Sequence, residues 1–199
     1  MIWWLRLRRV LLLAVITTAF WAVALSIGDT GLPLPQLGGA TSASVPLILL
    51  APLAPAIALN TGHIRAPLIE ATAGRTIARG DTALAAATVA LTALVMSLAL
   101  TNLGPEPELA GQAVRNLALY TGMALIGRTL LGGPASTVPP VAFALATATF
   151  GYGPQQTAHW WAWPAAHPTD PLAALATLII VAYGLRTAAL QDRPRRHLR

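Results

Sequence analysis

Six apolar stretches alternate with polar connections along the chain, and this alternation predicts helices of membrane-spanning length. The expected helices cover residues 10–27, 45–60, 82–103, 113–131, 138–150 and 172–190. A straight helix needs about 20 residues to cross the hydrocarbon core of a bilayer. The second and fifth stretches are shorter, and the second contains Pro46, Pro52 and Pro55. We expect these two stretches either to recruit flanking residues or to be broken or partly re-entrant.

The composition favours lipid over water as the solvent for most side chains. Hydrophobic residues make up 55% of the 199 residues and charged residues 10%, with a mean hydropathy of +0.62, whereas soluble domains carry about 25% charged residues. The sequence therefore predicts an all-α polytopic membrane protein with about six transmembrane helices, in a single transmembrane domain covering residues 1–199. A basic start before the first apolar stretch also fits a cleaved signal peptide, but the length of that stretch favours a retained helix.

The arginines indicate the orientation of these helices. With six helices and the amino terminus inside, all of the 13 basic residues except Arg115 fall on the inner side. The outer connections then hold four acidic residues, Asp29, Glu106, Glu108 and Asp170. This asymmetry follows the positive-inside rule. We therefore expect a multi-pass protein of the plasma membrane with both termini cytoplasmic, the lipid bilayer as its surroundings and no nucleic-acid partner.

The inner connection between the second and third helices is a candidate partner-binding segment. Pro67 suits the first turn of a short helix, and apolar residues share this stretch with Glu70, Arg75 and Arg79. Such a segment can lie as an amphipathic helix at the membrane surface. Two interpretations stay open: a docking element for a cytoplasmic partner, with these four residues in contact, or an interfacial loop held by phospholipid head groups.

The outer connection before the last helix is rich in aromatic residues. The residues of interest there are Tyr152, His159, Trp160, Trp161 and Trp163. They suit either an outer gate made of re-entrant elements or an aromatic belt at the interface, where tryptophan is favoured. The second interpretation is the simpler one. His159 and His167 have no further ligand cluster nearby in the sequence, so no metal site is expected.

Polar residues near the predicted helix ends have structural explanations. Arg115 and Arg128 are expected to extend toward the membrane surface, with Glu106 or Glu108 as partners of Arg115. Asn116 begins the fourth helix beside Arg115. Asn60 and Asn102 are expected to cap helix ends.

Several catalytic motifs are missing from the sequence. The chain has no lysine, so it cannot contain a P-loop. It also lacks the His-Glu-x-x-His and Gly-x-Ser-x-Gly motifs, and without cysteine it has no disulfide or thiolate site. We therefore expect no catalytic residues, no cofactor and no bound metal in this chain.

Three local segments carry a resemblance to a known family. Glu70-Ala-Thr-Ala-Gly-Arg75, Arg115-Asn-Leu-Ala-Leu-Tyr-Thr-Gly122 and Trp160-Trp-Ala-Trp-Pro164, together with the predicted topology, resemble small actinobacterial type-2 permeases of ATP-binding-cassette exporters. The topological likeness covers nearly the whole chain. Only a few residues precede the first helix, so the family's usual amphipathic amino-terminal helix is reduced or missing.

The resemblance implies a transport function. It implies a homo- or heterodimer that pairs with a separate cytoplasmic ATPase subunit and exports an amphipathic or hydrophobic substrate. Residues 67–79 would then be the coupling segment, with Glu70 and Arg75 as its main contacts, and residues 152–168 the re-entrant outer element. The short chain also fits one half of a heterodimer or a non-transporting structural or accessory membrane protein. An intramembrane enzyme is a third alternative.

Overall fold

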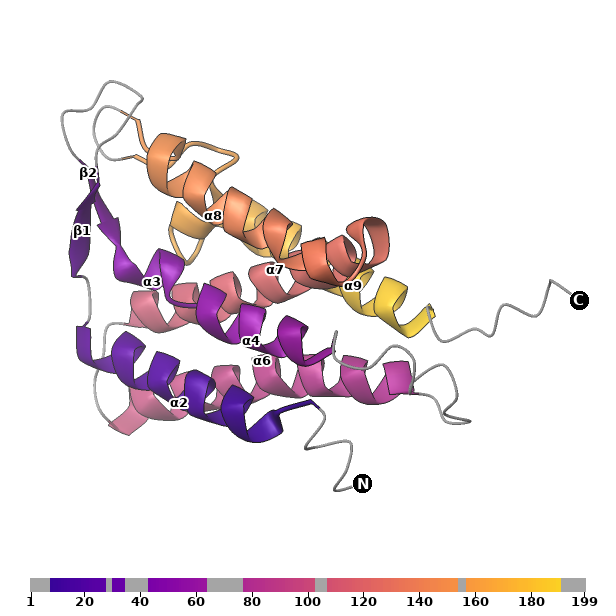
Figure 1. Ribbon diagram of the computed structural model, residues 1–199. Helices are drawn as coiled ribbons and strands as arrows, with labels where there is room; N and C mark the ends of the chain where they lie inside the picture. Colours follow the sequence, from indigo (N-terminus) through magenta and orange to yellow (C-terminus); the bar gives the residue numbers. More distant parts are fainter. Residues whose placement is uncertain are drawn as a thin grey trace, which may run out of the picture.

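The computed structural model describes residues 8–27, 30–34, 43–63, 77–102, 107–153 and 157–190 (Figure 1). The described chain is mostly helical. Its α-helices are α2 (Val10–Ile27), α3 (Leu47–Leu50), α4 (Leu53–His63), α6 (Ile77–Asn102), α7 (Pro107–Leu131), α8 (Val138–Phe150) and α9 (Pro171–Leu190). Two short 3-10 helices, η1 (Pro134–Thr137) and η2 (Trp163–Ala165), and two strands complete the described elements.

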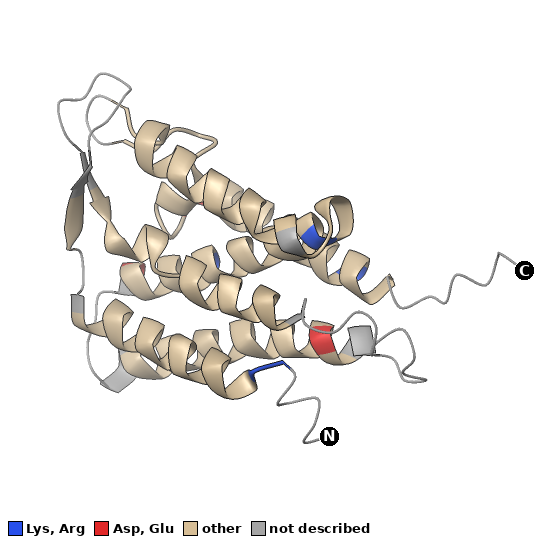
Figure 2. Cartoon of the chain, in the orientation of Figure 1, with Lys and Arg blue, Asp and Glu red and all other residues tan. Residues whose placement is uncertain are grey.

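The helices form a bundle in which successive long helices run in opposite directions (Figure 1). We call one end of the bundle the basic end, because Arg8 lies there beside the start of α6 and Arg128 reaches it from the end of α7. The opposite end carries the tryptophans of residues 157–170, and we call it the aromatic end. In Figure 2 the coloured charged segments gather mainly toward the basic end, and most of the bundle is tan.

Helix α7 lies at the centre of the bundle and contacts α4, α6, α8 and α9. Leu117, Leu119 and Tyr120 on this helix are completely buried. Its closest neighbour is α9, because a Cβ atom on Gly184 would lie only 2.7 Å from the carbonyl oxygen of Gly122. Small residues at a crossing let two helix backbones touch, which is how helices pack tightly in membranes.

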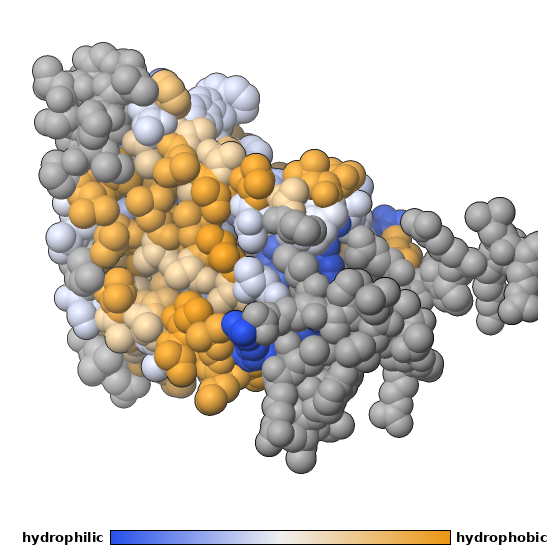
Figure 3. All heavy atoms as spheres, in the orientation of Figure 1, coloured by the Kyte–Doolittle hydropathy of each residue, from blue (hydrophilic) through white to orange (hydrophobic). Residues whose placement is uncertain are grey.

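The outward faces of several helices are apolar. Leu11 is 81% exposed and Leu178 is 66% exposed, and Figure 3 shows orange apolar atoms over much of the face in view. By length and composition, two segments can cross a membrane, Gly80–Ala99 and Pro171–Leu190, and only 28% and 22% of their residues are buried. The fold is thus helical with two candidate membrane-spanning helices. The full count of six spans and the orientation belong to the proposal below.

The predicted helix bounds fit some elements better than others. The first and fifth predictions, 10–27 and 138–150, coincide with α2 and α8. The second stretch, 45–60, is broken, which is one of the alternatives expected for it: the chain turns at residues 51–52 between α3 and α4. Pro52 lies at this turn, and proline cannot donate the backbone hydrogen bond that a continuous helix needs.

Two polar connections are more ordered than the sequence predicted. Between the first and second predicted helices, β1 (Gly31–Leu34) pairs antiparallel with β2 (Ala43–Pro46), with Leu32 opposite Val45. Helix α7 begins at Pro107, six residues before the start predicted for it at residue 113. Proline suits the first position of a helix, and Glu108 lies in the first turn, where negative charge is favourable.

Candidate functional site

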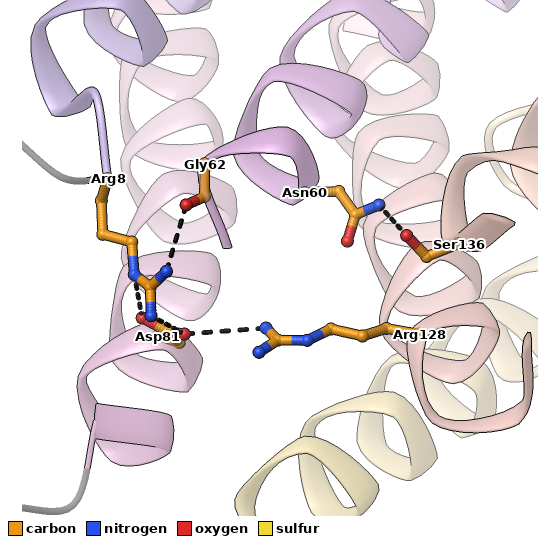
Figure 4. Close-up of polar contacts among 6 residues, drawn as sticks. All are labelled: Arg8, Asn60, Gly62, Asp81, Arg128 and Ser136. Carbon is orange, nitrogen blue, oxygen red and sulfur yellow. Dashed lines mark hydrogen bonds and ion pairs between the residues drawn. The ribbon is translucent and has the colours of Figure 1, made fainter. Parts of the chain in front are cut away.

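An ion cluster at the basic end joins α6, α7 and the residues that lead into α2 through one carboxylate. Arg8 Nε donates to Asp81 Oδ1 and Arg8 Nη2 donates to Asp81 Oδ2, each at 2.8 Å. Arg128 Nη1 lies 3.6 Å from Asp81 Oδ2 on the opposite side (Figure 4). Arg8 is 1% exposed and Asp81 4%, so the pair is buried. Forked bonds of this kind are the strongest ionic contacts available to an arginine.

The close approach of α4 to Arg8 depends on a glycine. Arg8 Nη1 also donates to the carbonyl oxygen of Gly62 at 3.1 Å. A Cβ atom at residue 62 would lie 2.6 Å from the carbonyl oxygen of Arg8, closer than two non-bonded atoms can pack. Arg9, next in the chain, has a φ of 50°, and this left-handed residue turns the backbone into α2. Arg8 is therefore fixed by its own backbone and by two other helices.

A second polar contact lies beside this ion cluster. Asn60 Nδ2 donates to Ser136 Oγ (Figure 4). Ser136 Oγ in turn donates to the carbonyl oxygen of Gly133. Asn60 is 2% exposed and Ser136 is completely buried. The contact joins α4 to the turn between α7 and α8. The expectation that Asn60 caps a helix is therefore wrong: it lies inside α4, facing η1 across the bundle.

These contacts surround the candidate coupling segment at both of its ends. We define the basic-end cluster as Arg8, Asn60, Gly62, Asp81, Arg128 and Ser136. Residues 64–76 connect α4 to α6. Gly62 lies near the end of α4 and Asp81 near the start of α6, and both Gly62 and Asp81 bind Arg8. Within the cluster two guanidinium groups share one carboxylate, so its net charge is positive.

The predicted partner-binding residues lie mostly outside the described chain. Pro67, Glu70 and Arg75 belong to residues 64–76, which the structure does not describe. The backbone of Arg79 lies in the first turn of α6, close in sequence to Asp81. Their role as partner contacts stays a prediction.

A second set of polar contacts lies at the aromatic end. Arg115 Nη1 donates to the carbonyl oxygen of His167 at 2.8 Å, and Nη2 donates to that of Ala166 at 2.6 Å. Gln112 Nε2 and Asn116 Nδ2 both donate to the carbonyl oxygen of Pro164, at 2.9 and 3.0 Å. Residues three and four apart share one face of a helix, so α7 presents these three side chains together.

These contacts correct the expectation for two arginines. Arg115 is 8% exposed and binds backbone carbonyls instead of extending to the surface; of its two expected partners, Glu106 lies outside the described residues. Glu108 pairs with His167 at 3.3 Å. Arg128 binds Asp81 and keeps only 21% of its side chain exposed. Backbone carbonyl groups outside helices and strands need hydrogen-bond donors from elsewhere. Arg115 donates to two such groups, those of Ala166 and His167.

The aromatic residues lie in one folded segment, with different surroundings. Trp160 is 82% exposed, whereas Trp163 packs on Phe143 with ring centroids 5.9 Å apart. His159 stacks on Trp161 at 6.3 Å. Tyr152 is buried, and its backbone pairs with Ala158. Within the described part of the chain, no group of three His, Asp or Glu residues could hold a metal ion.

Sequence patterns left several of these residues unassigned. In the sequence, Arg8 is only one of the basic residues on the predicted inner side, and nothing there assigns a contact to Asp81, Gln112 or Ser136. One signal was available for Asp81: a single acidic residue at the start of an apolar helix, at the membrane boundary where Arg8 and Arg128 are also expected. A buried charge requires a partner, so this arrangement predicts an ion pair.

No protein-family model, curated protein or solved structure is significantly similar to this chain. The two polar clusters therefore carry the functional interpretation. At the basic end, Arg8 and Asp81 link helices to each other. At the aromatic end, Arg115 and Asn116 hold a loop against α7. Both arrangements suit positioning and transmission of movement.

Proposed function

We propose that the chain is a multi-pass plasma-membrane subunit that crosses the bilayer about six times. Apolar side chains cover the outward faces of α2, α6 and α9, which favours lipid as their surroundings. Helix α9, with 20 residues, is about 30 Å long, the thickness of the hydrocarbon core. Helices α4 and α8 are shorter. Helix α4 would cross the bilayer together with α3, which precedes it, and α8 together with η1.

In this proposal the basic end faces the cytoplasm. Arg8 and Arg128 lie at that end among the described residues, and the tail after α9 carries further arginines. Cytoplasmic connections are enriched in arginine and lysine. The tryptophans of residues 160–163 would then lie at the outer interface, where indole rings are favoured.

Within this orientation, the chain acts as the permease subunit of an ATP-driven exporter. It works as a homo- or heterodimer with a separate cytoplasmic ATP-binding-cassette ATPase and moves an amphipathic or hydrophobic substrate. The observation that carries this proposal is the position of Arg8. Arg8 binds Gly62 before the candidate coupling segment and Asp81 after it, so a force on residues 64–76 acts on α2, α4 and α6 together.

Helix α7 gives this force a path to the other side of the membrane. Arg128 contacts the basic-end cluster, and Arg115 on the same helix holds the loop at the aromatic end. The two residues are about 20 Å apart along the helix axis. A rigid helix with contacts at both ends can transmit a displacement. The loop around Trp160 and Trp163 would then serve as the outer gate.

Co-purification with the ATPase tests the exporter proposal. The full-length chain is expressed with a P-loop ATPase encoded by a neighbouring gene, isolated in mild detergent and assayed for ATP hydrolysis. We expect a complex with stimulated ATPase activity, lost with Glu70→Arg and with Arg75→Glu. Arg186→Glu, an exposed residue on α9, is the matched control and leaves the complex intact. A chain that stays alone and stimulates no hydrolysis would instead be an accessory or structural membrane protein.

Labelling of single cysteines tests the orientation independently. The chain has no native cysteine, so one introduced thiol reports one position. A membrane-impermeant thiol reagent added to intact cells should label Trp160→Cys and leave Ala71→Cys unlabelled until the cells are opened. Labelling of Ala71→Cys in intact cells would place the coupling segment outside and refute the orientation.

A further inference from the structure

A groove runs along the aromatic half of the bundle between α6, α7 and α9. Its volume is about 530 Å³, and most of its lining is apolar, including Val89, Ala93 and Leu178. Pro168 from the loop of the aromatic end also lines it. Small-molecule and lipid sites have volumes of roughly 300–1,000 Å³. The groove is therefore large enough for a ligand, and it opens on the flank of the bundle.

The length of the groove matches one leaflet of a membrane. On α6 the lining extends from Val89 to Ser97, which is about 12 Å along the helix axis. One leaflet contributes about 15 Å, half of the hydrocarbon core. In the orientation proposed above, the groove begins near the outer interface and ends close to the middle of the bilayer. An extended hydrocarbon chain entering from the outer leaflet would follow this direction.

One charged side chain lines this apolar groove. Arg115 is 8% exposed, and its only hydrogen bonds among the described residues go to the neutral carbonyls of Ala166 and His167. Its Nε atom has no hydrogen-bond partner there. The long side chains of a helix point toward its amino terminus, so the guanidinium group lies toward the outer mouth of the groove, beside Pro168.

The positive charge of Arg115 is not neutralised by an ion pair in the described part of the chain. Asp170, whose carboxylate caps α9 by accepting a hydrogen bond from the backbone of Leu172 at 2.9 Å, acts on Arg115 electrostatically from beyond ion-pair distance. A buried cation is favoured when an anion compensates it. The mouth of the groove thus combines an apolar channel with a positive charge.

We propose that this groove binds an anionic phospholipid of the outer leaflet, with one acyl chain between α6, α7 and α9 and the phosphate beside Arg115. The apolar lining holds the hydrocarbon, and the guanidinium selects a negatively charged head group over a zwitterionic one. This inference rests on the orientation proposed above, but it does not depend on an ATPase partner.

Native mass spectrometry of the full-length chain in detergent tests the site with two defined probes. Dioleoyl phosphatidylglycerol and dioleoyl phosphatidylcholine share their acyl chains and differ in net charge. We expect the first phosphatidylglycerol to bind about ten-fold more tightly than the first phosphatidylcholine, since charge-assisted bonds are stronger than neutral ones. Arg115→Gln should bring the ratio close to one, and Arg115→Lys should keep most of it. Arg186→Gln is the control for a cation outside the groove.

A second pair of variants tests the groove without altering Arg115. Ala93→Phe places a ring in the groove and should weaken the binding of both lipids about ten-fold or more. Ala90→Phe, on an exposed face of the same helix outside the groove, should leave both affinities unchanged. Equal binding of the two lipids to the native chain, or unchanged lipid binding by Ala93→Phe, would overturn the proposal. A dimer that becomes a monomer with Ala93→Phe, while lipid binding persists, would assign the groove to a second copy.

Discussion

Replacing Asp81 with asparagine removes the carboxylate on which the basic-end cluster depends. Arg8 is 1% exposed and makes two hydrogen bonds of 2.8 Å with this carboxylate. Removing one partner of a buried pair costs about 3–5 kcal/mol, because a buried charge is left without compensation. Arg128 contributes less, since its side chain is 21% exposed and lies 3.6 Å away, a geometry worth about 0–1 kcal/mol. The asparagine oxygen still accepts one bond, so we expect a loss of about 3 kcal/mol.

Reversible unfolding of the full-length chain in detergent, followed by circular dichroism, measures this loss. Arg8→Gln should cost less than Asp81→Asn, because Asp81 keeps Arg128 as a partner. The double variant Arg8→Gln with Asp81→Asn should be more stable than the sum of the single effects, with a coupling energy of about 1–3 kcal/mol. Arg186→Gln replaces an exposed arginine and should change stability by less than about 0.5 kcal/mol.

Two results would refute this account of the basic-end cluster. If the free energy of unfolding of Asp81→Asn lies within about 0.5 kcal/mol of that of the native chain, then the buried ion pair does not stabilise the bundle. If the effects of Arg8→Gln and Asp81→Asn simply add, then the two side chains do not interact in the folded protein. Either outcome would also remove the support that Arg8 gives to the coupling proposal.

Three further predictions concern helix contacts and the loop at the aromatic end. Gly62→Ala should lower stability by about 1–3 kcal/mol in the same unfolding assay, because its Cβ atom would meet the Arg8 carbonyl oxygen at 2.6 Å; unchanged stability would show that α4 can shift freely. Gly184→Ala should destabilise the chain by a similar amount, about 1–3 kcal/mol, because its Cβ atom would lie 2.7 Å from a backbone oxygen of α7. Arg115→Gln should release the loop. A thiol introduced by Ala162→Cys lies at a completely buried position and should then react about ten-fold or more faster with a soluble thiol reagent. Equal reaction rates of this thiol with and without the Arg115→Gln substitution would contradict the role of Arg115.

The pattern of apolar residues predicted the positions of most helices. The stretch 10–27 coincides with α2, and 172–190 differs from α9 by one residue at its start. A run of apolar residues measures which part of the chain leaves water, and this property is local. The same pattern missed the start of α7 at Pro107, because a proline and an acidic residue are also common in the first turn of a helix.

The contacts between helices could not be predicted in the same way. Arg8 and Asp81 are far apart in the sequence, and so are Asn60 and Ser136. All four residues fall at or just outside the ends of the predicted helices, and the sequence alone assigns no partner to any of them. Which of them meet depends on the order and tilt of the helices, and no periodicity within one segment records that arrangement.

By itself the sequence determined the apolar character of the chain and the approximate positions of most of its helices, because hydropathy and the need to satisfy backbone hydrogen bonds act on each segment separately. Only the tertiary structure decided that Arg8 and Arg128 share Asp81, and that Arg115 holds the loop of the aromatic end beside an apolar groove. The physical reason is that a buried charge must find its partner in space, and the packing of α7 against its neighbours sets which partner is within reach.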